Sequence, residues 1–163
     1  MVATRLASKW TPHGIVQRLR NLAKEPGDTT LALHIGVFLW RLPRQMERMP
    51  LPLLLDRLRA GARPDAPDIH RAAQRIARLR QPWLNLSLLR NRSTCYMRAL
   101  TLYRFLPTRE RTLRIHFGVE PGIDPADRLR GHAWVTVSNE IFEPPDPLIA
   151  GRVREIYCHP PEE

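Results

Sequence analysis

Two kinds of hydrophobic periodicity follow each other along the chain, and the change between them lies near residue 90. Before it, apolar residues such as Ile69 and Ile76 recur at the spacing of an α-helix. After it, Leu113, Ile115 and Phe117 alternate with polar residues, as in a half-buried strand. Each apolar face must be buried against another element. The pattern therefore predicts an α+β fold, with a helical N-terminal half followed by one more helix and a small antiparallel sheet.

Four helices are expected ahead of the strands. They cover residues 29–49, residues 53–59, a segment capped by Asp68 and ended by Pro82, and a segment from Ser93 to Pro107. Pro43 lies inside the first of these segments. It predicts a kink or an end near Leu42, because proline cannot donate the helical hydrogen bond.

The strands are expected at residues 112–119 and 132–137, with Ser138-Asn139 as a tight hairpin turn into residues 140–143. An edge strand is expected at residues 153–157. A segment rich in proline and aspartate, residues 63–68, is interpreted as a linker. The chain is accordingly divided into a helical N-terminal region, 1–64, and a core, 65–163.

The chain is strongly basic. Its formal charge is +10, and arginine carries almost all of it, since Lys9 and Lys24 are the only lysines. Such a surface can attract nucleic acid, an anionic membrane or an acidic peptide. The arginines are spread along the sequence and no nucleic-acid-binding motif accompanies them. We therefore interpret them as surface cations and expect no nucleic-acid partner.

The longest apolar run, residues 31–40, is too short to cross a bilayer, and no signal peptide opens the chain. A cytoplasmic protein without a transmembrane segment is expected. In that compartment a disulfide between Cys95 and Cys158 is not expected. The pair Cys158-His159, combined with His116 or His132, fits no zinc signature, so no metal or other cofactor is expected.

Cys95 has the setting of a nucleophile. It opens a predicted helix, where first-turn amides favour thiolates and can stabilise an oxyanion. His132 begins a predicted strand directly after a loop. A histidine on a strand facing a cysteine on a helix is the arrangement of papain-like and transglutaminase-like sites. The alternatives are a buried structural cysteine and a histidine that only forms a hydrogen bond at the end of a strand.

A third side chain should orient the imidazole ring. The candidates are Asn139, Glu140, Glu143 and Asp146. Asn139 and Glu140 lie in the turn, too close to His132 in sequence to approach its ring. Glu143 is therefore the first choice, and Asp146 is the second.

Two neighbours of the predicted pair have two interpretations each. Trp134 either closes off the site or packs on the core. Arg98, one helical turn after Cys95, either binds a peptide carboxylate or lies in solvent.

Three segments taken together resemble one known family. They are STCYMRALTLYRFL at residues 93–106, HFGV at residues 116–119 and GHAWV at residues 131–135. In this order and spacing they are similar to the lasso-peptide maturation proteases, the B-type proteins of bacterial microcin-like clusters. The resemblance covers about residues 65–146 and implies a transglutaminase-like core.

The resemblance implies a cysteine peptidase that removes the leader from a ribosomally made precursor peptide, so that an ATP-dependent macrolactam synthetase can close a ring. It assigns Cys95 as nucleophile and His132 as base. Glu143 holds the place of the acidic member, where aspartate is commoner. Because residues 1–80 show no strand pattern, the leader-recognition module is expected on a separate chain.

Two other hypotheses remain open. One is a transglutaminase-like acyltransferase or amidase that uses the same residues with another acyl acceptor. The other is a non-catalytic, arginine-rich peptide-binding module in which Cys95 is structural.

Overall fold

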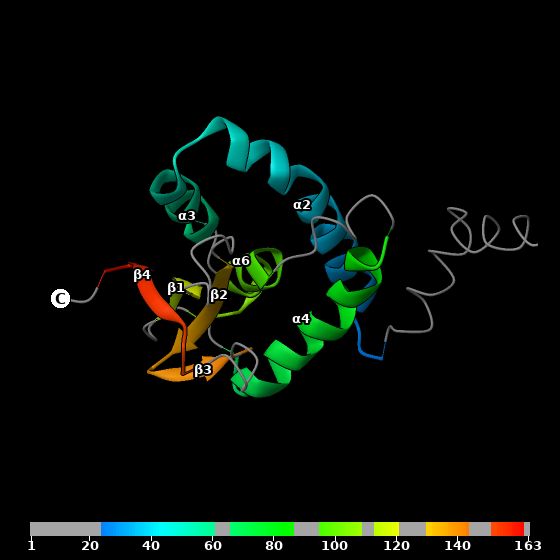
Figure 1. Ribbon diagram of the computed structural model, residues 1–163. Helices are drawn as coiled ribbons and strands as arrows, with labels where there is room; N and C mark the ends of the chain where they lie inside the picture. The colour runs from blue at the N-terminus through cyan, green and yellow to red at the C-terminus, as the bar shows by residue number, and fades with distance from the viewer. Residues whose placement is uncertain are drawn as a thin grey trace, which may run out of the picture.

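The computed structural model describes residues 24–60, 66–86, 95–108, 113–120, 130–143 and 151–161. Its helices are α2 (Asp28–Arg48), α3 (Leu51–Arg59), α4 (Ile69–Leu84) and α6 (Cys95–Phe105), and its strands are β1 (Leu113–Glu120), β2 (Arg130–Val137), β3 (Glu140–Phe142) and β4 (Arg154–His159). The helices precede the strands, so the predicted α+β class is confirmed (Figure 1). None of the described helices combines the length and the apolarity needed to cross a bilayer.

The strands form one antiparallel sheet in the order β3-β2-β1-β4. Ser138 and Asn139 join β2 to β3 with positive φ angles of 50° and 69°, as a two-residue hairpin turn requires. β4 lies at one edge of the sheet, beside β1. The predicted hairpin turn and the predicted edge strand are both confirmed.

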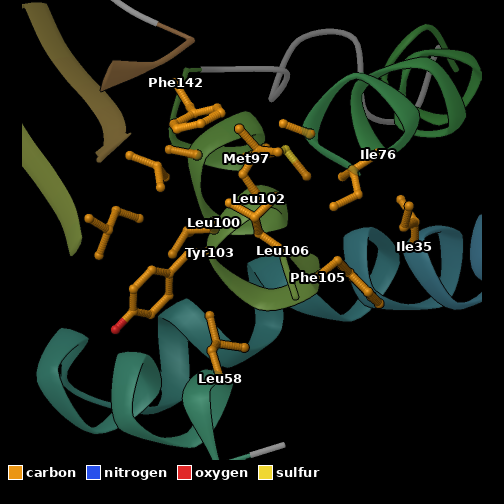
Figure 2. Packing of buried hydrophobic residues seen from close by; sticks show 14 of the residues in the cluster. Ile35, Leu58, Ile76, Met97, Leu100, Leu102, Tyr103, Phe105, Leu106 and Phe142 are labelled. Carbon is orange, nitrogen blue, oxygen red and sulfur yellow. The ribbon is translucent and has the colours of Figure 1, made fainter. Parts of the chain in front are cut away.

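Helix α6 is surrounded by the other elements. It contacts β1, β2, α2, α3 and α4, and Figure 2 shows Ile35 of α2, Leu58 of α3 and Ile76 of α4 around it. Seven of its eleven residues are buried, as expected of a helix in the core. The buried residues of α6 are Met97, Ala99, Leu100, Thr101, Leu102, Tyr103 and Phe105. This burial fixes the position of its first residue, Cys95.

Two prolines that were expected to disturb helices lie inside them. Pro43 lies inside α2, which continues to Arg48, and Pro82 lies inside α4, which continues to Leu84. The helix end predicted at Pro82 is therefore wrong. Of the kink or end predicted near Leu42, the end does not occur, and α2 matches the single helix expected over residues 29–49. Leu84 is only 2% exposed, so burying a side chain beyond the proline compensates for the hydrogen bond that proline cannot donate.

Helices on both sides of the predicted boundary at residue 65 share one core. Leu39 of α2 and Leu55 of α3 belong to the same cluster of buried residues as Leu79 of α4 and Leu100 of α6. The division into two regions stays a prediction. In the described fold, the first region supplies part of the packing around α6.

A buried carboxylate joins the start of α2 to α4. One oxygen of Asp28, which is fully buried, accepts hydrogen bonds from the Lys24 and Glu25 amides and from Arg78, and the other accepts one from Arg75 at 2.5 Å. Burial alone would raise the pKa of Asp28. The hydrogen bonds outweigh it, so the pKa lies below its usual value of 3.8. The carboxylate therefore stays charged and holds the two helices together.

Asp28→Ala is expected to lower the free energy of unfolding by about 2 to 3 kcal/mol, because it removes the buried carboxylate that binds the partly buried guanidinium groups of Arg75 and Arg78. The pKa of this carboxyl is lower in the folded state than in the unfolded state. Its contribution is therefore complete above the unfolded pKa and is lost as the pH falls through the folded pKa. Urea unfolding of wild type and variant between about pH 7 and about pH 2 measures both effects. A stability difference that acid leaves unchanged would contradict this account.

Candidate active site

Cys95 is the first residue of α6, where the sequence predicts a helix start. Its side chain is partly buried, and its Sγ donates a hydrogen bond to the carbonyl oxygen of Gly131 at 3.3 Å. Gly131 directly precedes His132 in β2. The structure therefore brings the thiol to the residue beside the predicted base. The thiol proton stays on sulfur and is donated to this backbone carbonyl.

The close approach of α6 to β2 depends on a glycine. A Cβ atom at Gly131 would lie 2.2 Å from the Tyr96 hydroxyl oxygen and 3.0 Å from two of its ring carbons. The Tyr96 ring also stacks on Phe117 of β1, with the ring centroids 5.6 Å apart. Any larger residue at position 131 would push the start of the helix away from the strand. The pair Tyr96–Gly131 thus sets the distance between the thiol and the start of β2.

Tyr96 stays protonated at neutral pH. Burial raises the pKa of its hydroxyl, and the neighbouring Cys95 raises it further. The hydroxyl therefore remains a hydrogen-bond donor beside the thiol.

His132 has a carboxylate neighbour that is not among the candidates predicted from the sequence. Its Nε2 atom lies 3.8 Å from Oε2 of Glu120. The two side chains are 15% and 10% exposed, and neither of these two atoms has a hydrogen-bond partner. Two buried polar atoms that face each other in this way are one small movement from a hydrogen bond, which would remove the cost of leaving both unpaired.

Strand register explains why these two residues meet. In the β1–β2 pair, Gly118 lies opposite His132 and Glu120 lies opposite Arg130. Glu120 and His132 are therefore diagonal neighbours on one face of the sheet. The other oxygen of Glu120 pairs with Arg152 at 3.2 Å. The predicted strand ends one residue before Glu120, and the length of the following loop hides the register. The feature of the sequence that could have indicated Glu120 is a carboxylate at the end of a predicted strand, and this feature alone is a weak signal.

Glu143, the predicted third member, has another partner. Its Oε1 accepts a very short hydrogen bond from Arg80 of α4, whose side chain is 3% exposed. Arg80 also donates to the Arg98 carbonyl of α6 at 3.0 Å. Among the described residues, the carboxylate that approaches His132 is Glu120 and the cation that binds Glu143 is Arg80. The catalytic role of Glu143 stays a prediction.

The other candidates for the third role are placed as follows. Asn139 is exposed in the hairpin turn, and Glu140 lies 3.3 Å from the exposed ring of His70. Asp146 lies outside the described residues.

The structure also places Trp134 and Arg98, for which the sequence allows two interpretations each. Trp134 stacks on His116 with their centroids 5.4 Å apart and their planes at 4°, so it covers that histidine. The side chain of Arg98 is exposed.

Three side chains of metal-ligating type meet on β1 and β4. Ligand atoms of His116, Glu155 and Cys158 all lie within 4.8 Å of one another. An irregularity in the β1–β4 register places Glu155 opposite Gly118, and so its carboxylate reaches Nδ1 of His116 at 2.8 Å. The other ring nitrogen contacts Thr136 at 2.8 Å. Both ring nitrogens thus have protein partners, and a cation could bind only if the His116–Glu155 contact opened.

Comparison with known proteins adds one finding. The sequence model of one family, described as the Transglutaminase-like superfamily, matches residues 29–155. No curated protein and no solved structure shows a significant match to the chain. The matched segment begins in α2 and ends in β4, and it contains Cys95, His132, Glu120 and Glu143.

Alkylation of Cys95 tests the thiol–imidazole pair without any substrate. In a Cys158→Ala background, in which Cys95 is the remaining thiol, iodoacetamide is expected to react with it rapidly near neutral pH. His132→Ala should slow that reaction roughly tenfold, since the base that takes the proton is gone. Intact-protein mass spectrometry at several times of reaction gives both rates. Equal rates with and without His132 would mean that the ring does not serve the thiol.

Proposed function

The chain belongs to the transglutaminase-like superfamily, and on that basis we propose that it is a cysteine peptidase with Cys95 as nucleophile and His132 as base. We further propose that its substrate is a ribosomally made precursor peptide from which it removes the leader, as its motifs suggest. A separate leader-recognition protein and an ATP-dependent macrolactam synthetase would be its partners.

One observation carries the proposal. The Cys95 thiol, at the start of a buried helix, lies 3.3 Å from the carbonyl oxygen of the residue before His132. Amides in the first turn of a helix favour negative charge. A thiol in this place serves two needs of acyl transfer, because the same amides can stabilise the oxyanion that forms on the substrate.

The proposed reaction has two halves. His132 takes the proton from the Cys95 thiol, and the thiolate attacks the carbonyl carbon of the scissile peptide bond. The C–N bond then breaks, and His132 returns the proton to the departing amine. In the second half, water attacks the thioester while His132 takes its proton, which releases a new carboxylate and restores the thiol.

We assign the third role to Glu120, as a positioning residue. A hydrogen bond from His132 Nε2 to Glu120 would leave Nδ1 as the atom that accepts the thiol proton. Arg152, 3.2 Å from the other oxygen of Glu120, holds the carboxylate in place. Glu143 would then serve the fold, because it neutralises the buried guanidinium of Arg80.

An acyltransferase is the second candidate function. The same residues would form the same thioester, and an amine in place of water would resolve it. The two activities differ in product mass, which can be measured after turnover in the presence of a primary amine. The family itself favours this alternative as much as it favours hydrolysis.

Cys95→Ala and His132→Ala are each expected to abolish cleavage of a precursor peptide encoded beside the gene, with losses of at least about a thousandfold. Both variants should fold, because neither side chain belongs to the buried apolar cluster. Cys158→Ala is the matched control and should retain activity. Mass spectrometry of the products and circular dichroism of the variants make the test. If both variants still cleave the precursor, the assignment of Cys95 and His132 as the catalytic pair is wrong.

Glu120→Gln and Glu143→Gln separate the two carboxylates. Glu120→Gln should lower kcat about a hundredfold with little change in KM or stability, and Glu120→Asp should restore part of it. Glu143→Gln should instead lower the free energy of unfolding by about 3 kcal/mol, since it leaves a buried cation unpaired. Kinetics and urea unfolding of the three variants distinguish these outcomes. If Glu143→Gln lowers kcat without lowering stability, then Glu143 is the residue that orients His132.

A further inference from the structure

A cavity between α2, α3 and α6 is lined by cations. Its volume is about 520 Å³, and three arginines from three different helices line it: Arg41 of α2, Arg57 of α3 and Arg104 of α6. His34 and Gln45 add two more nitrogen-bearing side chains. None of the described residues that line this cavity is acidic. Cavities of this size commonly hold a ligand or several side chains of a partner.

The arginines of this cavity have no carboxylate partner among the described residues. Arg104 donates a hydrogen bond to the Leu58 carbonyl at 2.8 Å. A second cavity of similar volume, about 530 Å³, is different. Its arginines, Arg71 and Arg75, are paired with Glu25. Among the described residues, carboxylates neutralise the cations of the second cavity and not those of the first, so the positive charge of the first can attract an anionic ligand.

The same cavity has an apolar lining. Val37, Phe38, Leu58 and Phe105 line it together with the arginines. Phe38 and Phe105 meet edge to face with their centroids 5.5 Å apart, and Figure 2 shows Leu58 and Phe105 on the α3 and α6 sides of the core. A bare phosphate ion would leave this apolar surface unused. A chain that carries both carboxylates and apolar side chains would use both parts of the lining.

We propose that this cavity binds an acidic segment of a polypeptide, with glutamate or aspartate carboxylates on the arginines and apolar side chains on the aromatic lining. Arg104 lies nine residues after Cys95 in α6, so the cavity is about 14 Å from the nucleophile along the helix. An extended peptide spans that distance with about four or five residues. A substrate chain that reaches both places must cross the surface, because α6 itself is buried, so about four or five residues is the minimum length of the segment. This use as a recognition site rests on the proposed peptidase function, whereas binding of an acidic peptide does not.

A binding experiment tests the proposal on the full chain. The probe is a peptide in which leucine and glutamate alternate, labelled with a neutral fluorophore and followed by fluorescence anisotropy. The double variant Arg41→Gln/Arg57→Gln should weaken binding about tenfold or more. Both side chains are exposed, so the variant should fold. Arg48→Gln, an exposed arginine of α2 outside this lining, is the matched control and should bind as wild type does.

Each further outcome has a definite meaning. The same peptide with glutamine in place of glutamate should bind much more weakly, and equal binding would overturn the proposal. Equal affinities of wild type and the double variant would also overturn the proposal.

A single-stranded oligonucleotide tests the competing ligand class. If it binds more tightly than the peptide, with the same dependence on Arg41 and Arg57, the ligand of the cavity is nucleic acid and the proposal is overturned. If the double variant also raises the KM for precursor cleavage at unchanged kcat, the cavity serves substrate recognition. If the chain binds the peptide but cleaves no precursor, the binding proposal stands and the proposed peptidase function is wrong.

Discussion

The site depends on how closely the start of α6 can approach the start of β2. Tyr96 packs over Gly131, where a Cβ atom would lie 2.2 Å from its hydroxyl oxygen. That contact brings the Cys95 thiol to the backbone of β2. The rest of α6 is held by apolar contacts with the sheet and with three helices. The thiol is therefore positioned by a helix of the protein core, which gives a nucleophile the fixed geometry that acyl transfer needs.

The charge of the chain has more than one structural use. The arginines of α4 at positions 75 and 78 neutralise the buried Asp28, and Arg80 neutralises Glu143. Arg152 pairs with Glu120 next to His132. The arginines that line the cavity between α2, α3 and α6 have no such partners among the described residues. The formal charge of +10 thus conceals a division between cations that hold the fold together and cations that face a cavity.

Much of the fold follows from local signals. The Asp68 side chain caps α4 by accepting from the Arg71 amide at 2.9 Å, as its residue type predicts. Ser138-Asn139 forms the predicted hairpin turn. Pro82 does not end α4 as predicted, because a proline in the sequence indicates only a lost hydrogen bond and nearby strain. Whether a helix continues past that loss depends on the burial of residues beyond it, which is a tertiary property.

The sequence by itself determined the α+β class, the position of Cys95 at a helix start and the position of His132 near a strand start, because each depends on residues close by in the chain. Only the tertiary structure decided which carboxylate approaches the imidazole. Glu143 lies at a suitable distance along the chain, but Arg80 of a distant helix binds it. Glu120 reaches His132 through a strand register that follows a loop. The partner of a charged side chain is set by which segments fold against each other, and the spacing of residues along the chain does not contain that information.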